Sequence, residues 1–548
     1  MERRLIFAIA LMIVVAIIPS FFLKQPPRRP VAPPQAAESA AATVRPPAPA
    51  AGIAAVAAAP AAALPASAAA PVAAESVTIA SPKARYRFST LGAALEGAEL
   101  TSYRSMKDRG AVVDLVRPGD RLLAYRLVVG ADTLRFDSAA FAPTRTAAGV
   151  AFAAARGAVR VDVSYAPTPG RNYEIDVTGA IEGLEGRGAL LLVGMGTGLA
   201  NVEADSLDNY RRYGVVGRQD QPEEKAFQKV GPGETATLEG PYDWVAVKSK
   251  YFIAALLSGD TTKREFGGAT ITGGPRPGRV ATHAQTWVTR AVGPDGRFRF
   301  QLYAGPQEYR EIHAVGRQLD KASPYGWIFK FIVMPVSVWI TQLLLWMHQF
   351  LHLGYGLVLI LFGLLVRLTL WPLNQKAMMS SVGMQVVQPI LKDIQARHKD
   401  DPARMQQETL KVYREHGVNP LGGCLPMLLP FPILLALFFV FANTIEFRGV
   451  PFLWLPDLSL RDPYYIIPVV MGASMWALSK LGQLGMPPNP QAKMMTTVMP
   501  IMMTVLFLNF ASGLNLYYAV SNLVSLPQQY LINKARTREM ERRKGKGA

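Results

Sequence analysis

The sequence has little cysteine and no motif for nucleotide chemistry. Its single cysteine, Cys424, lies in an apolar run, which excludes an intramolecular disulfide framework and a cysteine-rich metal site. The chain has no Gly-x-x-x-x-Gly-Lys-Ser/Thr motif, and the glycine-rich stretch 194–198 lacks a following lysine, so we interpret that stretch as a loop or bulge. No pair of carboxylates occurs at an informative spacing. We therefore predict no catalytic residues, no metal site and no cofactor.

Acidic residues are scarce beside basic ones. The chain has 58 Lys and Arg against 40 Asp and Glu, a net charge of +18, and half of its 548 residues are hydrophobic. A basic and apolar chain is typical of a membrane protein whose basic segments face the cytoplasm and anionic lipid. Nucleic-acid binding is the competing interpretation, but the basic residues cluster beside apolar runs and do not form one aromatic-interleaved basic face. We predict a multi-domain membrane protein with no DNA partner.

The N-terminal region divides into an apolar run and a low-complexity tract. Arg3 and Arg4 precede the apolar run Leu5–Leu23, and no small-x-small cleavage site follows that run at once. We therefore interpret residues 1–24 as an uncleaved transmembrane anchor with a cytoplasmic N-terminus, a cleavable signal peptide being the alternative. Residues 25–75 contain eleven prolines and many alanines, which predicts an extended linker without a core.

Residues 76–315 have the pattern of a β-domain. Alternating apolar and polar residues occur at 121–129, 159–165 and 173–177. Many short strands over such a length predict a large β-sandwich outside the membrane. Trp244 and Trp287 are candidates for sugar stacking or for burial in the sandwich core, and we favour burial.

The remaining residues contain five apolar runs of membrane-spanning length: Tyr355–Leu373, Leu421–Phe441, Tyr464–Leu481, Met494–Phe510 and Leu514–Ile532. A further apolar stretch, 324–352, would place the charged segment 376–418 outside if it crossed the membrane. We therefore interpret it as an amphipathic helix on the outer surface. With the anchor, this gives six spans, a five-span core over 353–532, and a basic tail over 533–548, with both termini cytoplasmic.

The segment 377–418 between the second and third spans predicts a helical hairpin. The positions Met384, Val387, Leu391, Ile394 and His398 follow alternating spacings of three and four, which is a heptad seam. Asp401 is placed as an N-cap and Pro402 as the first residue of a second helix. We expect the hairpin to lie in the cytoplasm, either as an inert loop or as a docking arm.

Arg367 is a single guanidinium within the apolar run Tyr355–Leu373. An arginine near the middle of such a span costs about 2.5–3.5 kcal/mol on insertion scales and usually faces a bundle interior or a wet cavity. The alternative is that its long side chain reaches the membrane surface without any role in function. Position alone leaves both interpretations open.

Five short motifs resemble one family of membrane proteins. Arg367 is followed by Trp371-Pro372-Leu373, and the further motifs are Asn419–Pro426, Asp462–Pro468, Met499-Pro500 and Ser512–Tyr518. Their order over about 210 residues resembles the YidC/Oxa/Alb family of membrane protein insertases. The anchor, the external sandwich and the surface helix resemble its Gram-negative form, in which the sandwich is periplasmic.

The resemblance implies a function without catalysis. Members of the family insert and fold inner-membrane proteins, alone or with the Sec translocon, and their five core spans enclose a hydrophilic groove open to the cytoplasm and to lipid. Arg367, Tyr517 and Tyr518 match positions in that groove, where the arginine attracts acidic or polar substrate tails. Side chains expected to contact the departing apolar helices are Pro430, Leu434, Met503 and Phe510. Many family members carry a polar residue at the position of Pro430.

The expected partners follow from the same resemblance. They are nascent inner-membrane proteins, the Sec translocon, membrane lipids and, through the basic tail and the cytoplasmic loops, the ribosome. Two other classes remain as alternatives. A transporter or channel predicts several intramembrane charges or an internal repeat, and Arg367 is the only clear charge of this kind. A membrane-anchored carbohydrate-binding or carbohydrate-active protein predicts an acid pair in a cleft of the sandwich, which the sequence does not display.

Overall fold

The computed structural model describes residues 75–546 apart from short gaps at 109, 277, 324–329, 400, 416–430 and 485–489. All described residues belong to one unit of the chain, Ala74–Ala548. The predicted anchor over 1–24, nearly all of the predicted linker over 25–75, Cys424 and Pro430 lie outside the described residues.

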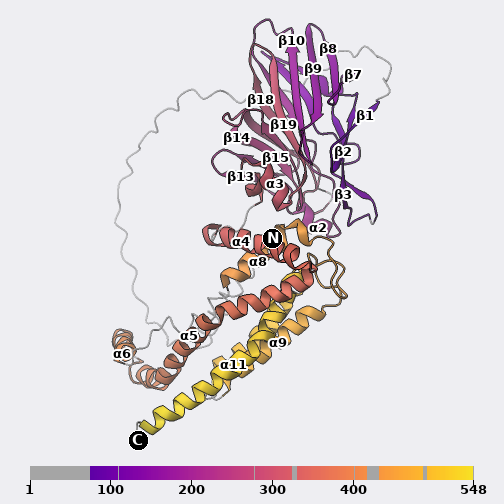
Figure 1. Ribbon diagram of the computed structural model, residues 1–548. Helices are drawn as coiled ribbons and strands as arrows, with labels where there is room; N and C mark the ends of the chain where they lie inside the picture. Colours follow the sequence, from indigo (N-terminus) through magenta and orange to yellow (C-terminus); the bar gives the residue numbers. More distant parts are fainter. Residues whose placement is uncertain are drawn as a thin grey trace, which may run out of the picture. The chain divides into compact units, whose positions relative to one another are not determined.

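The N-terminal part of this unit is built from antiparallel sheets (Figure 1). The nine-stranded sheet has the spatial order β13 (Pro222–Ala226), β12 (Gly214–Arg218), β15 (Trp244–Lys248), β16 (Phe252–Ser258), β19 (Arg297–Pro306), β10 (Glu174–Glu182), β9 (Val159–Pro167), β8 (Val150–Arg156) and β7 (Ala142–Arg145). The six-stranded sheet has the order β14 (Thr235–Tyr242), β17 (Phe266–Gly273), β18 (Ala284–Val292), β11 (Ala189–Gly194), β5 (Ala124–Val129) and β6 (Asp132–Arg135). The four-stranded sheet contains β1 (Ser76–Ala80), β2 (Ala84–Ser89), β3 (Leu95–Arg104) and β4 (Val112–Asp114).

The strands form because side chains alternate between a buried and a solvated face. Along β18, buried and half-buried residues alternate almost without a break, as expected for a sheet with one face on a core. Strand β16 is buried at all seven positions, which marks it as a central strand covered on both faces. The predicted β-sandwich is therefore confirmed.

The two tryptophans of the sandwich have different environments. Trp244 is fully buried, and its Nε1 donates a hydrogen bond of 3.0 Å to the carbonyl of Arg317. Trp287 is half-buried, and the Arg126 guanidinium lies 4.1 Å from its ring centroid. Burial in the core is confirmed for Trp244, whereas Trp287 packs beneath a cation at the edge of the core.

Two local expectations are decided by backbone conformation. The strand predicted over 121–129 begins only at Ala124, because Leu123 has a positive φ of 60° that extended chain does not adopt. The glycine-rich stretch 194–198 is a turn, as predicted, with a φ of +68° at Gly196, and Asp120 accepts hydrogen bonds from both the N–H and the hydroxyl of Thr197.

The helices include two short ones beside the sandwich and seven in the C-terminal part. They are α2 (Ser206–Tyr210), α3 (Tyr309–Val315), α4 (Lys330–Leu351), α5 (Tyr355–Arg397), α6 (Pro402–Glu415), α8 (Phe431–Asn443), α9 (Ile466–Gln483), α10 (Pro490–Phe507) and α11 (Ser512–Lys546). Single 3-10 turns occur at η1 (Phe136–Ser138), η2 (Phe227–Lys229), η3 (Leu319–Ala322) and η5 (Ile445–Phe447).

Membrane-spanning length is clear for one helical segment. Among the described residues, only Tyr355–Gln375 at the start of α5 is both long and apolar enough to cross a bilayer. Pro432–Asn443 and Thr496–Phe507 are shorter apolar helices. Six spans therefore remain a prediction.

Two helices do not end where the apolar runs of the predicted spans end. The fifth predicted span ends at Phe510, but α10 ends at Phe507, and Phe510 lies in the short link to α11. The last helix does not stop where the basic tail begins at 533 but continues to Lys546. Lys, Arg and Glu are good helix formers, so a change from apolar to charged residues does not end a helix.

Helices α5 and α6 pack against each other at the far end of α5. Val387 and Leu391 of α5 are buried with Val412 of α6. Asp401 accepts a hydrogen bond of 3.0 Å from the N–H of Arg404, which caps the first turn of α6. Because α5 is continuous over 43 residues, about 65 Å at 1.5 Å per residue, these contacts lie far from its apolar first half.

Candidate functional site

Arg367 lies where α5 packs against α11. Its Nε donates hydrogen bonds to the carbonyl oxygen of Ser521 at 3.1 Å and to the Ser521 hydroxyl at 2.9 Å. One turn earlier on α5, a Cβ on Gly363 would lie 3.3 Å from a methyl carbon of Val520. The missing side chain thus allows α11 to approach closely, as small residues do between membrane helices. Figure 1 shows the two helices side by side.

The guanidinium of Arg367 has hydrogen-bond partners but no counter-ion among the residues that the structure describes. Within the described part of the chain, no carboxylate lies within 4.0 Å of it. Its Nη groups donate to no protein group among the same residues. A carbonyl and a hydroxyl orient the group without neutralising its charge. The site therefore presents a half-buried, oriented cation.

The two predicted groove tyrosines lie on α11 beside the arginine. Tyr517 is buried, one turn before Ser521, and its ring centroid lies 5.6 Å from that of Phe362 on α5. Tyr518 contacts Tyr517 edge-on at 5.4 Å. The structure thus brings Arg367 together with Tyr517 and Tyr518, which follow it by about 150 positions in the sequence.

Phe510 is joined to these tyrosines through a series of aromatic contacts. Consecutive ring centroids lie 4.9 to 5.6 Å apart along Phe362, Tyr517, Tyr518, Phe507, Phe510 and Phe438. The series connects α5, α11, α10 and α8. Leu434 on α8 and Met503 on α10 are half-buried, and in the described residues Arg367 makes its side-chain hydrogen bonds to Ser521 and not to either of them. Pro430 lies outside those residues.

A polar face of α11 was missed by the sequence reasoning. Asn515, Asn522 and Gln529 are buried and are spaced by seven residues, a repeat that places them on one side of a helix. Asn522 donates to the hydroxyl of Ser474 on α9 at 3.3 Å. Gln528, on the side facing α5, donates to the carbonyl of Trp371 at 3.2 Å. The seven-residue spacing of amides was the available signal.

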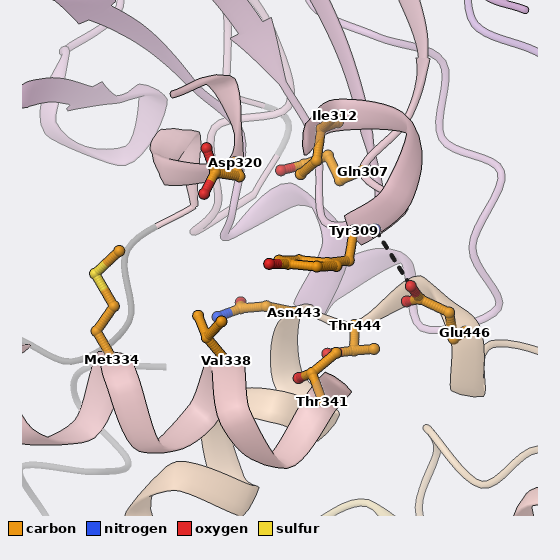
Figure 2. A pocket seen from close by; sticks show the side chains of 10 residues that line it. All are labelled: Gln307, Tyr309, Ile312, Asp320, Met334, Val338, Thr341, Asn443, Thr444 and Glu446. Atoms are coloured by element: carbon orange, nitrogen blue, oxygen red, sulfur yellow. Dashed lines mark hydrogen bonds between the residues drawn. The ribbon is translucent and has the colours of Figure 1, made fainter. Parts of the chain in front are cut away.

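A second candidate site is a small cavity between the sandwich and the helical core. Figure 2 shows its lining, which comes from the end of the sandwich, from α4 and from the segment after α8. The Glu446 carboxylate accepts a hydrogen bond of 3.2 Å from the N–H of Tyr309, and its second oxygen is buried without a partner. Burial raises the pKa of Glu446 to about 7. The cavity measures about 20 Å³, room for about one water molecule, so it is a packing junction and not a ligand site.

A buried ion pair reinforces this junction. Arg448 donates from Nε to both carboxylate oxygens of Glu203 at 2.9 Å and from Nη1 to the carbonyl of Arg104 at 2.9 Å. The side chains of Arg448 and Glu203 are only 4% and 8% exposed. Burial raises the pKa of Glu203, and the positive charge of Arg448 opposes that rise. The segment after α8 is thus held on the sandwich.

A β-sandwich joined to apolar helices, one of them long enough to cross a bilayer, is the arrangement expected of an integral membrane protein with a large domain outside the bilayer. The family described as YidC periplasmic domain matches residues 76–347, and the family described as 60Kd inner membrane protein matches residues 346–540. The chain belongs to the YidC family of membrane protein insertases. It is accordingly an inner-membrane protein with a periplasmic domain.

Similar curated proteins are about one-third identical to this chain over the residues that align. The membrane protein insertase YidC of Chlorobium phaeovibrioides is 36% identical over 321 residues, which cover 54% of this chain and 53% of that protein. The protein of the same name from Syntrophus aciditrophicus is 35% identical over 335 residues, 60% of this chain and 58% of that one. The chain thus matches somewhat more than half the length of these relatives, which are named membrane protein insertases.

Two solved structures resemble the chain at low sequence identity. A crystal structure of an active YidC insertase with its first transmembrane domain resolved is 18% identical, covers 84% of this chain and 93% of that one, and has a TM-score of 0.34. A galactose mutarotase-like protein from Lactobacillus casei is 12% identical, covers 42% of this chain and all of that one, and has a TM-score of 0.30.

Proposed function

We propose that this protein inserts other proteins into the inner membrane, and that Arg367 receives their hydrophilic tails. The observation that carries the proposal is the position of this cation, half-buried at the contact of α5 and α11, with no carboxylate partner among the described residues. A cation in an apolar helix costs free energy unless a counter-charge or water relieves it. An acidic substrate tail relieves that cost when it enters.

The electrostatics favour transient binding over catalysis. A unit charge attracts an opposite charge more strongly where the local dielectric constant is low, so a tail that enters beside Arg367 is stabilised relative to bare lipid. Ser521 holds the guanidinium in place without competing for its charge. The tail binds non-covalently and without a nucleotide, so it can dissociate again. Release of the apolar helix into lipid is driven by burial of apolar surface.

The proposed route for that helix runs along α8 and α10. Leu434 and Met503 are half-buried on these helices, and Phe510 joins them through its ring contacts with Phe438 and Phe507. Methionine and aromatic side chains adapt to apolar partners of varied shape. Pro430 is assigned to the same route from the family resemblance. Nascent inner-membrane proteins and lipid are the proposed partners, with the Sec translocon and the ribosome as further ones.

The proposed topology has six spans, with both termini and the α5–α6 hairpin in the cytoplasm. It places α4 flat on the outer surface. Support comes from the two faces of α4. Ser337 is buried and donates to the carbonyl of Ala436 on α8, whereas Trp339, Trp346 and Phe350 are exposed. A helix with one packed side and one exposed aromatic side suits the membrane interface.

Depletion of the protein tests the proposed function. A small single-span substrate is pulse-labelled after depletion, and its translocated tail is tested for digestion by external protease. After depletion, we expect the tail to be protected from the protease. Expression of the wild-type gene should make the tail accessible to digestion again. The Arg367→Ala variant should restore little, and Arg397→Ala, an exposed arginine on the same helix, should restore fully. Normal insertion after depletion would contradict the proposal.

A further inference from the structure

The loop between α8 and α9 presents apolar side chains on a strained backbone. Leu453 is 74% exposed and Tyr464 is 68% exposed. Leu453 has a positive φ of 54°, and Tyr465, which follows Tyr464, has a positive φ of 58°. Non-glycine residues rarely adopt this conformation, which glycine or asparagine would occupy at less cost. The φ of Leu453 belongs to a tight turn closed by backbone hydrogen bonds between Phe452 and Leu455. The leucine side chain at the tip of that turn takes little part in the protein's own packing.

Buried hydrogen bonds hold the loop in this form. Asp462 is fully buried and accepts hydrogen bonds from Trp454 Nε1 at 3.2 Å and from the N–H groups of Tyr464 and Ile467 at 3.0 and 2.8 Å. The first turn of α11 adds a bond of 2.7 Å from the N–H of Ser512 to the loop. These hydrogen bonds therefore fix the backbone that carries the exposed side chains.

The exposed surface of this loop has one chemical character. Its exposed side chains are Pro451, Leu453, Trp454, Pro456, Arg461, Pro463, Tyr464 and Tyr465. The two acidic residues of the same segment, Asp457 and Asp462, are both buried. Tryptophan, tyrosine and leucine beside a single arginine, with no exposed acid, match the composition of a membrane interface with phosphate headgroups.

The loop is continuous with an apolar helix face and lies on the side of the sandwich. Ile466, Val469 and Val470 at the start of α9 are exposed apolar residues that directly follow Tyr465. The other end of the loop is held to the sandwich by the ion pair of Arg448 with Glu203. In the proposed topology, the membrane surface on the side of this loop is therefore the periplasmic one.

We propose that residues 451–466, the outer anchor, insert into the periplasmic leaflet of the bilayer, with phospholipid as their partner. Leu453 and Tyr464 enter the boundary between headgroups and acyl chains, and Arg461 meets the phosphates. The anchor sets the depth at which α9 begins. The inference rests on the proposed topology, in which α9 crosses the membrane, and it adds a lipid-binding surface to that topology.

Depth-dependent fluorescence quenching tests the outer anchor. In a Cys424→Ser background, an NBD probe is attached to Leu453→Cys and the protein is reconstituted into phosphatidylethanolamine–phosphatidylglycerol vesicles. Lipids with a nitroxide near the headgroup or deep in the chain report lipid contact, and iodide reports water. Val469→Cys is the control for lipid and Leu207→Cys, exposed on the sandwich helix α2, is the control for water.

We expect position 453 to show a blue-shifted emission relative to 207, stronger quenching by the shallow than by the deep nitroxide, and protection from iodide. Iodide quenching equal to that at 207 would overturn the anchor. Protection from both iodide and lipid nitroxides would also overturn it, because a protein partner or a second copy would then cover the loop. If position 469 shows no lipid quenching, the proposed topology fails together with the anchor. Lipid quenching at 469 but not at 453 overturns the anchor alone.

A second variant separates lipid contact from backbone strain. Leu453→Gly suits a positive φ and removes the apolar tip, so it is expected to fold. With the probe on Tyr464→Cys, this change should red-shift the emission and weaken quenching by the shallow nitroxide, because the loop loses its insertion at 453. Unchanged emission and quenching would contradict a role for Leu453 in the anchor.

Discussion

The positive charge of Arg367 is oriented by Ser521 but is not neutralised by a carboxylate among the described residues. The sequence singled out this arginine, because a charge in an apolar run stands out from its neighbours. It did not identify Ser521, since one serine among many polar residues of α11 carries no signal until α5 and α11 are packed together. A hydrogen-bond partner 154 positions away depends on tertiary packing, which a local sequence pattern does not reveal.

Ser521→Ala removes one of the two oxygens that orient Arg367, while the backbone carbonyl stays. Because a single hydrogen bond contributes about 1 kcal/mol, we expect insertion of an acidic-tailed substrate to fall by roughly fivefold at limiting protein. The protease-mapping assay measures this. Thr504→Ala is the matched control and should insert normally, since within the described ranges the Thr504 hydroxyl bonds only to a carbonyl of its own helix. Equal losses in both variants would point to a general destabilisation.

Glu446 gives the junction a pH dependence whose sign is fixed by burial. Its pKa rises from 4.5 to about 7 in the folded protein. The folded state therefore binds the proton more tightly than the unfolded state, and this stabilisation is present below about pH 4.5 and is lost as the pH rises through about 7. The effect is on the order of 1–3 kcal/mol. The thermal unfolding midpoint should rise between about pH 8 and about pH 5, and the rise should be smaller in Glu446→Gln. An identical rise in both proteins would show that other groups produce it.

At the scale of elements, pattern predicted most of the secondary structure and little of the pairing. Alternation with period two indicated the sandwich, and apolar runs indicated the helices α5, α9 and α10. The exact ends depended on packing, as at Leu123, whose positive φ delays β5. The polar face of α11 was readable in principle from its seven-residue spacing, but an otherwise apolar span masked it. Which helix that face meets required the structure.

The contact between Asn522 on α11 and Ser474 on α9 is expected to couple these helices. Hydrogen bonds between membrane helices average about 0.6 kcal/mol by double-mutant cycles. We predict a coupling free energy of about that size for Asn522→Ala combined with Ser474→Ala, measured by reversible unfolding in mixed micelles. Additive effects of the two changes would show that the 3.3 Å contact contributes nothing.

At the scale of the whole molecule, the sandwich and the helical core meet through charged side chains. The resemblance and the composition predicted a sandwich beside a helical core, but not that Glu203 and Arg448 join them across 245 positions. No motif or spacing in the sequence marks either residue. Charges of this kind become structural only when burial removes their water, and burial is set by the complete fold.

Arg448→Ala leaves Glu203 buried without its partner. Removing one member of a buried pair typically costs about 3–5 kcal/mol, so we expect a large drop in the unfolding midpoint. Arg461→Ala, an exposed arginine nearby, should change stability little. The double variant Arg448→Met with Glu203→Leu should recover much of the loss. If it is as unstable as Arg448→Ala, the burial of an unpaired charge is not the cause.

The most direct test of the account is the dependence of insertion on two charges at once. One substrate is made with an acidic tail and one with the same tail neutralised to amides, and each is inserted by wild-type protein, Arg367→Lys and Arg367→Ala. If Arg367 receives acidic tails, Arg367→Ala should impair the acidic substrate strongly and the neutral one weakly, while Arg367→Lys should retain most insertion of both. Equal impairment of both substrates by Arg367→Ala, or full insertion of the acidic one, would contradict the account.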